Sequence, residues 1–134
     1  MTEGLVELAV NGGLMRGMRA EYAMLEAGAL FVREARSAPC YRLFNIDERH
    51  PAMLRVAAQG ACVMLEIWRL PPAGFVKILQ REPQGLSVGH VQLDDGTWML
   101  GVIGEPILCA DKPDITEYGG WLGEIALCAS PQGH

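Results

Sequence analysis

Apolar residues in this chain come in short runs, most of them with strand-like alternation, and this pattern predicts several short strands with few helices. Gly, Pro, Asn and Asp separate the runs and mark the connections between them. Turns are expected at residues 47–51 and at residues 94–96, where Asp-Asp-Gly has the composition of a β-hairpin turn. The expected strands are residues 8–10, 30–34, 41–46, 53–57, 62–70, 86–93 and 97–108.

The run over residues 62–70 is apolar at both alternating sets of positions, which is typical of a strand that is covered on both faces. We therefore expect it to be a central strand. Glu66 lies inside this run, and a carboxylate in such a place needs a hydrogen-bonding partner or an altered pKa. An ion pair with an arginine is the commoner explanation, and a catalytic role is the alternative.

Three helices are expected. The first follows Gly17 and ends near Gly28, and the second spans residues 73–81 after a proline suited to the first turn. Pro83 ends the second helix, so that Glu82 lies at its exit, where a carboxyl group can face a cleft. The third is expected to start at a capping-box pattern over residues 114–117 and to continue through Trp121 and Ile125.

Together these elements predict an α+β fold, a small mixed, partly closed β-barrel with flanking short helices. The 134 residues fit a single domain over residues 1–134, and the sequence shows no internal repeat or linker. Because half of the residues are apolar and 20% are charged, a compact folded chain is expected rather than a disordered one.

The charge and the hydropathy restrict the partners that we expect. A net charge of −5 argues against a nucleic-acid partner. No apolar run approaches the ~18 residues of a membrane span, and the N-terminus has no signal-peptide pattern, so we expect no membrane partner and a cytoplasmic location. The cysteines form no CxxC pair and have no metal-ligand spacing, so neither a metal nor another cofactor is expected. They are Cys40, Cys62, Cys109 and Cys128.

The candidate binding site is the turn that follows the first strand, within residues 8–17. Two adjacent glycines can aim several backbone N–H groups into one concavity, where they bind a carboxylate or another small anion. An ordinary tight turn is the alternative. The residues expected to contact the ligand are Asn11, Gly12, Gly13, Leu14 and Met15.

Further ligand contacts are expected from an arginine-rich stretch over residues 33–55. A guanidinium group can form two hydrogen bonds with a carboxylate, and we expect Arg36, or Arg33 beside it, to add positive charge to the pocket. Ser37 is a candidate hydroxyl group of the same pocket. Surface ion pairs for the arginines and a turn position for the serine are the alternatives.

Several stretches resemble known proteins. The opening Leu-Ala-Val-Asn-Gly-Gly-Leu-Met-Arg-Gly resembles the strand-and-loop signature of the gamma-glutamylcyclotransferase-like fold. The stretches Gly-Ala-Leu-Phe-Val-Arg-Glu-Ala, Leu-Glu-Ile-Trp-Arg-Leu-Pro and Ile-Thr-Glu-Tyr-Gly-Gly-Trp, with Ala-Pro-Cys-Tyr-Arg-Leu between the first two, resemble the C-terminal domain of allophanate hydrolase and its stand-alone relatives. This resemblance runs in order over roughly residues 5–125.

The resemblance implies a barrel with a pocket floored by the glycine loop. In the cyclotransferases, the loop amides hold the gamma-glutamyl group and a glutamate after the crossing helix acts as general acid and base; Glu82 matches that position. The allophanate hydrolase domain is implicated in the loss of CO2 from the carboxylated carbamate that an amidase leaves. That domain commonly has a histidine in the first loop, whereas His50 and His90 lie far along this chain.

Three functions follow. The preferred one is a pocket for a small carboxylate or carbamate, with lyase activity as a decarboxylase related to allophanate and urea-type nitrogen metabolism. The second is cyclotransferase chemistry, in which Glu82 moves a proton and 5-oxoproline is released. The third is a non-catalytic partner of a separate amidase, assembled with that amidase or as a homodimer.

Overall fold

A computed structural model describes residues 4–123 of the chain. Seven strands and a few short helices follow one another in an order that mixes the two. The strands are β1 (Val6–Val10), β2 (Leu30–Arg36), β3 (Tyr41–Ile46), β4 (His50–Arg55), β5 (Met64–Leu70), β6 (Leu86–Gln92) and β7 (Trp98–Gly104). The helices are α1 (Glu21–Glu26), α2 (Pro72–Arg81), α3 (Pro106–Cys109) and the 3-10 helix η1 (Thr116–Tyr118).

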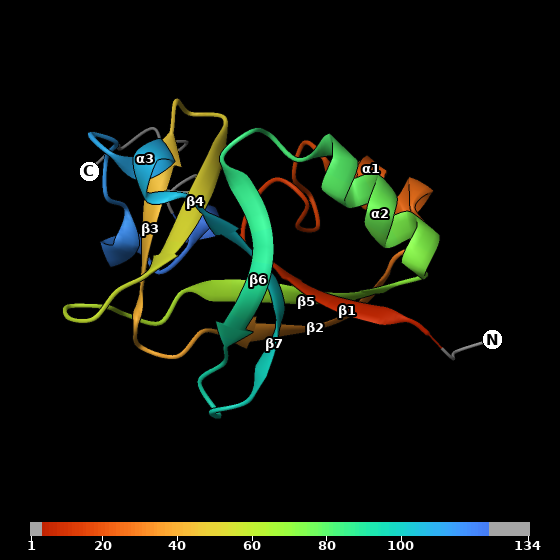
Figure 1. Cartoon of the computed structure of the whole chain (residues 1–134), viewed down its shortest axis with the longest axis horizontal. Helices are drawn as coiled ribbons and strands as arrows, with labels where there is room; N and C mark the ends of the chain where they lie inside the picture. The colour runs from red at the N-terminus through yellow and green to blue at the C-terminus, as the bar shows by residue number, and fades with distance from the viewer. Residues whose placement is uncertain (1–3, 124–134) are drawn as a thin grey trace.

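Five strands form a mixed sheet in the order β2-β5-β1-β7-β6, and β3 and β4 form a separate hairpin. The helices α1 and α2 lie side by side at one end of the sheet, and the β3–β4 hairpin lies at the other (Figure 1). The position of β5 between β2 and β1 confirms the prediction of a central strand there. Its apolar side chains enter cores on both faces of the sheet, for example Leu70 on one and Leu65 on the other.

The α+β class is confirmed, whereas the sheet is not closed into a barrel. Within residues 4–123, the edge strands β2 and β6 meet just beyond their ends, at a single bridge between Ser37 and Leu93. Backbone hydrogen bonds from Ala38 to Gln92 and from Asp94 to Arg36 flank that bridge. The sheet therefore curves far enough for its edges to touch at one corner and stays open along the rest.

The β3–β4 connection is tighter than the predicted turn over residues 47–51. The turn consists of Asp47, Glu48 and Arg49, and the first two of these have positive φ values of 56° and 63°. His50 then pairs with Ile46, and Pro51 pairs with Asn45, so both belong to β4. The tight turn carries residues 49–51 toward the first loop.

The helix α2 begins at Pro72 and ends at Arg81, close to the prediction. Pro83 disfavours helical geometry at the residue before it, and Glu82 accordingly has an extended backbone with φ −64° and ψ 141°. The backbone N–H of Glu82 still donates to the carbonyl of Leu79 at 3.4 Å. Glu82 is thus fixed directly at the helix end, as its place in the sequence indicated.

Two predictions in the C-terminal third differ from the structure. The strand expected over residues 97–108 ends at Gly104, because Pro106 starts α3. The helix expected from the capping-box pattern is only the 3-10 turn η1, which ends at Gly119 with φ 84°. Residues 121–123 are helical again, and the predicted end at Ile125 lies outside the described residues.

No helix in residues 4–123 combines the length and the apolar character that crossing a membrane requires.

Candidate functional site

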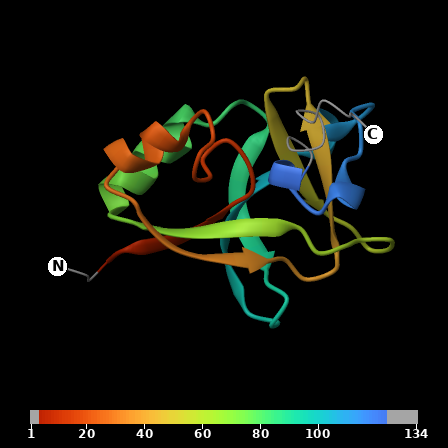
Figure 2. The same ribbon diagram turned by 180° about the vertical axis from the view of Figure 1, so that it is seen from behind.

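A pocket of about 450 Å³ opens where β1 ends. Its walls come from the loop after β1, from α1, from the start of β4 and from the end of α2, with Leu86 of β6 and Val102 of β7 behind them. Figure 2 shows the loop, coloured red to orange, between the helix pair and the end of the sheet that carries the β3–β4 hairpin. Segments distant in the sequence therefore meet around one cavity.

The loop that lines this pocket has backbone donors without a partner. Gly12, Gly13 and Leu14 line it, and no residue of the range 4–123 accepts a hydrogen bond from their backbone N–H groups. The carbonyls of Gly12 and Gly13 are occupied, because they accept from the N–H groups of Met15 and Ala20 at 2.9 Å each. A loop with occupied acceptors and free donors is suited to bind an anion.

Asn11 joins the loop to the sheet. The residue is 4% exposed and lines the pocket, and its Nδ2 donates to the carbonyl of Val102 at 3.0 Å. Since a carbonyl only accepts, this bond fixes the orientation of the amide group. No described residue donates to the Oδ1 of Asn11, which is left as an acceptor beside the loop donors.

Glu82 lines the same pocket from the end of α2. Burial raises the pKa of its carboxyl group from the ordinary 4.5 to about 7, because the surroundings disfavour the charged form. Near neutral pH the group is thus divided between its acid and its base form. A group with such a pKa can both donate and accept a proton at that pH.

Arginines surround the pocket although the whole chain is acidic. Arg19, Arg49 and Arg81 line it, from the loop, the hairpin and α2 respectively, whereas Glu82 is its one lining carboxylic acid among the described residues. The guanidinium group of Arg81 also donates to the hydroxyl group of Tyr22 and lies 5.0 Å from the centre of its ring. The pocket is therefore positively charged around its loop donors.

His50 lines the pocket as well, which the sequence analysis missed. Its Nδ1 lies 3.0 Å from the carbonyl oxygen of Pro51, and because this oxygen can only accept, Nδ1 carries the proton. The Nε2 of the neutral ring is then an acceptor. The signal that could have placed His50 here is the pair Asp47-Glu48, which forms a turn tighter than the one expected.

The structure brings Asn11, Gly12, Gly13, Leu14 and Glu82 together in the pocket, as expected from the sequence. Three other predicted ligand contacts do not line it, for reasons of packing. The buried Met15 belongs to the apolar core, and Arg36 lies at the far end of β2. Ser37 follows Arg36 and is fully buried, where its Oγ donates to the carbonyl of Ala38 and accepts from the N–H of Val63.

The cysteines lie apart from the pocket. Cys109 is buried, Cys40 and Cys62 are half-buried, and all three are free thiols, while Cys128 lies outside the described residues. Burial raises the pKa of the Cys109 thiol, which disfavours its reactive thiolate form. Over residues 4–123, no three His, Cys, Asp or Glu side chains form a cluster that could hold a metal ion.

We predict that Gly12→Ala distorts the loop. A Cβ atom at Gly12 would lie 2.3 Å from Cδ of Pro51, whereas one at Gly13 would meet only the Cβ of Ala20 at 3.8 Å. Gly12→Ala should lower the free energy of unfolding by about 1–3 kcal/mol, the usual cost of overpacking, in urea titrations. Gly13→Ala is the matched control, with an expected change within about 0.5 kcal/mol. Equal stabilities of the two variants would contradict the prediction.

The comparisons with known proteins agree with the predicted resemblance. The family model of the allophanate hydrolase C-terminal domain matches residues 6–126. The urea amidolyase of Lachancea kluyveri is 27% identical in an alignment 126 residues long, which covers 89% of this chain and 7% of that protein. This chain thus spans only a small part of the curated relatives that it matches.

Solved structures give the same picture. The crystal structure of c4763, described as a uropathogenic E. coli-specific protein, matches with a TM-score of 0.89 and 45% identity over 91% of this chain and 96% of that one. Kluyveromyces lactis allophanate hydrolase matches with a TM-score of 0.86 and 25% identity over 90% of this chain and 21% of that one. A gamma-glutamyl cyclotransferase shares the fold alone, with a TM-score of 0.53 at 12% identity over 82% of this chain and 69% of its own. The chain belongs to the allophanate hydrolase C-terminal domain family and has a gamma-glutamylcyclotransferase-like fold.

Proposed function

We propose that the pocket binds a small carboxylate or carbamate ion and that Glu82 transfers a proton to it. The observation that carries the proposal is the combination of free amides with this carboxyl group in one pocket. Gly12, Gly13 and Leu14 offer backbone N–H groups, and the Glu82 carboxyl, which lines the same pocket, has a pKa of about 7. The arginines around the pocket favour a negatively charged ligand.

The ligand that fits these groups is a carbamate that carries a second carboxyl group on its nitrogen. Such a molecule has an anionic end for the loop amides and an N–H group between its two carboxyl carbons. The Oδ1 of the buried Asn11 is a free acceptor at the pocket and is suited to receive that N–H. A plain carboxylate would leave this acceptor without a donor.

The proposed reaction is decarboxylation. The bond between the carbamate nitrogen and the departing carboxyl carbon breaks, and its electron pair stays on the nitrogen. The carboxyl proton of Glu82 moves to that nitrogen, CO2 leaves, and the Glu82 carboxylate regains a proton from water. The loop amides stabilise the remaining carboxyl group, onto which negative charge spreads during the step.

The family supports a place in nitrogen metabolism. The family model is that of the C-terminal domain of allophanate hydrolase, and the curated relatives are urea amidolyases. Hydrolysis of an N-carboxylated urea by an amidase leaves a carboxylated carbamate, the compound described above. We therefore propose that an amidase reaction supplies the substrate, whichever protein carries that amidase.

The test uses malonate, in which a methylene group replaces the carbamate N–H so that no C–N bond can break. We expect millimolar malonate to shift the NMR signals of the Gly12 and Gly13 amides and to raise the melting temperature. In a second assay, an amidase and allophanate generate the carbamate in situ, and this protein should speed the release of CO2. Failure of both assays would overturn the proposal, and release of 5-oxoproline from a gamma-glutamyl amine would favour cyclotransferase chemistry instead.

A further inference from the structure

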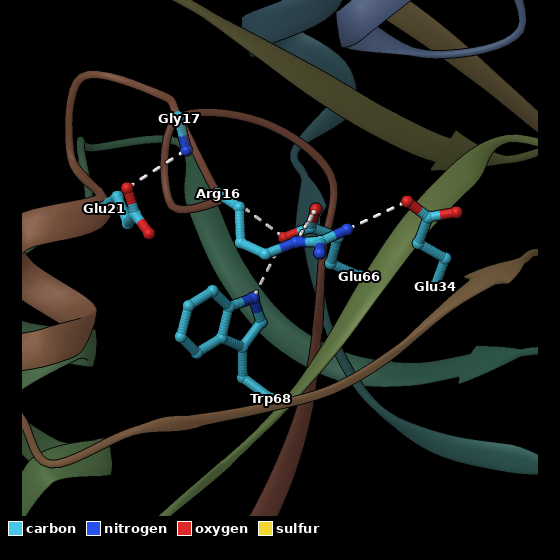
Figure 3. Close-up of polar contacts among 6 residues, drawn as sticks. All are labelled: Arg16, Gly17, Glu21, Glu34, Glu66 and Trp68. Carbon is cyan, nitrogen blue, oxygen red and sulfur yellow. Dashed lines mark hydrogen bonds and ion pairs between the residues drawn. The ribbon is translucent and has the colours of Figure 1, made fainter.

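Glu66 is a buried carboxylate that accepts three hydrogen bonds, two of them from one residue of the loop. Its Oε1 accepts from the backbone N–H of Arg16 at 2.9 Å and from Trp68 Nε1 at 3.2 Å. Its Oε2 accepts from Arg16 Nε at 3.0 Å (Figure 3). Glu66 is 1% exposed, so it exchanges its contacts with water for these three donors.

This arrangement attaches both ends of the glycine loop to one residue of β5. The last residue of β1, Val10, pairs with Glu66 in the antiparallel ladder. The chain then leaves through residues 11–15 and returns at Arg16, which the Glu66 side chain binds. Thus, the free amides of Gly12–Leu14 lie in a loop whose two ends are tied to the same point of the sheet.

The residues on either side of Arg16 are also held by hydrogen bonds. The backbone N–H of Met15 donates to the carbonyl of Gly12, and the backbone N–H of Gly17 donates to Glu21 Oε1 at 3.1 Å. The guanidinium group of Arg16 lies 3.7 Å above the Phe31 ring and reaches the exposed Glu34 at 2.9 Å. Figure 3 shows Arg16 between the two carboxylates. Among residues 12–17, only the backbone N–H groups of Gly12, Gly13 and Leu14, three residues that line the pocket, have no acceptor within the described chain.

We propose that Glu66 is a positioning residue for the anion-binding amides, acting through Arg16. Glu66 holds Arg16, the residue at which the loop returns to the sheet, so that the amides of Gly12, Gly13 and Leu14 keep the spacing that a carboxylate requires. This inference rests on the proposed function of the pocket.

The role requires both oxygens of a carboxylate. In Glu66→Gln the single oxygen can still accept from the backbone N–H of Arg16, but the new NH2 group then faces Arg16 Nε–H, donor against donor. The variant keeps the size of the side chain and removes the hydrogen bond from the guanidinium group of Arg16. Glu34→Gln is the matched control, because it changes the exposed partner of the same guanidinium group.

The experiment measures malonate binding to the full chain by NMR together with the pKa of Glu82. Glu66→Gln should weaken malonate binding about tenfold, the scale of one lost charge-assisted hydrogen bond, while the pKa of Glu82 stays near 7. Glu34→Gln should stay within about twofold. Unchanged affinity in Glu66→Gln would overturn the inference. Weaker binding with a Glu82 pKa back at its ordinary value would also overturn it, since the whole pocket would then have loosened.

Two further measurements keep the result decisive. If Glu66→Gln does not fold, Arg16→Lys retains the charge and the backbone bond but loses the planar donor group, and it should weaken malonate binding about threefold. No change in that variant would then overturn the inference. The Arg16 N–H keeps an acceptor in Glu66→Gln, but without the bond to the guanidinium group the loop should open more often. Exchange of the Arg16 amide without ligand should therefore be at least about tenfold faster in Glu66→Gln than in Glu34→Gln. This readout decides the positioning role even if the wild type binds no malonate, a result that would count against the proposed function.

Discussion

Replacing Glu82 with glutamine is expected to lower the rate of CO2 release by about 100- to 10,000-fold, the usual contribution of a general acid. Glutamine has nearly the same shape and remains at the end of α2, but it has no carboxyl proton to give to the carbamate nitrogen. Because the loop amides are untouched, malonate affinity should change less than about threefold. The rate is measured with the amidase-coupled assay and the affinity by NMR.

The pH dependence of the wild type gives this prediction its sharpest form. The acid form of Glu82 is the reactive one, and its pKa is about 7, so the rate should fall as the pH rises through that value. Glu26→Gln, at an exposed position of α1, is the control and should keep both the rate and the profile. A Glu82→Gln variant that retains the wild-type rate would contradict an acid role for this residue.

The parts of the site that could be predicted from the sequence are those set by local chemistry. Pro83 ends α2 one residue after Glu82, and Gly12 with Gly13 marks a turn directly after a strand. Each signal depends only on neighbouring residues. The family resemblance supplied what local signals lack, namely that these two segments, 70 residues apart in the chain, border one pocket.

The parts that could not be predicted depend on packing between distant segments. A partner for Glu66 was expected, and an arginine was the favoured kind, but several arginines were available and only the fold selects Arg16. His50 reached the pocket because a three-residue turn shifted the start of β4. Conversely, Arg36 was expected in the pocket from its charge, yet the direction of β2 carries it away.

A buried glutamate, Glu66, and a half-buried one, Glu82, lie next to this loop, and the fold treats their carboxyl groups differently. Glu66 has three N–H donors, one of them from a guanidinium group, and serves to hold the backbone. No described residue donates a hydrogen bond to Glu82. Only protonation therefore relieves the free-energy cost of removing its charged carboxylate from water. A group in this second situation lowers the stability of the folded protein whenever it is charged. The reactivity proposed for Glu82 and a cost in stability therefore have the same cause.

That cost should be measurable as a pH-dependent difference in stability between the wild type and Glu82→Gln. The folded protein holds the Glu82 proton up to a pKa of about 7, whereas the unfolded chain releases it near 4.5. The stabilisation that the acid form provides is therefore complete below about pH 4.5 and is lost as the pH rises through 7. Relative to the wild type, Glu82→Gln should gain about 3 kcal/mol in unfolding free energy over this range.

Urea titrations of both proteins at several pH values between about 4 and 8 measure this difference. All other titrating groups are shared by the two proteins and cancel in the comparison, so the remaining slope belongs to Glu82. The gain should approach about 1.4 kcal/mol per pH unit between the two pKa values and level off above pH 8. A difference that stays constant with pH would mean that the Glu82 carboxyl is as well solvated in the folded protein as in the unfolded chain. The general-acid role would then lose its physical basis.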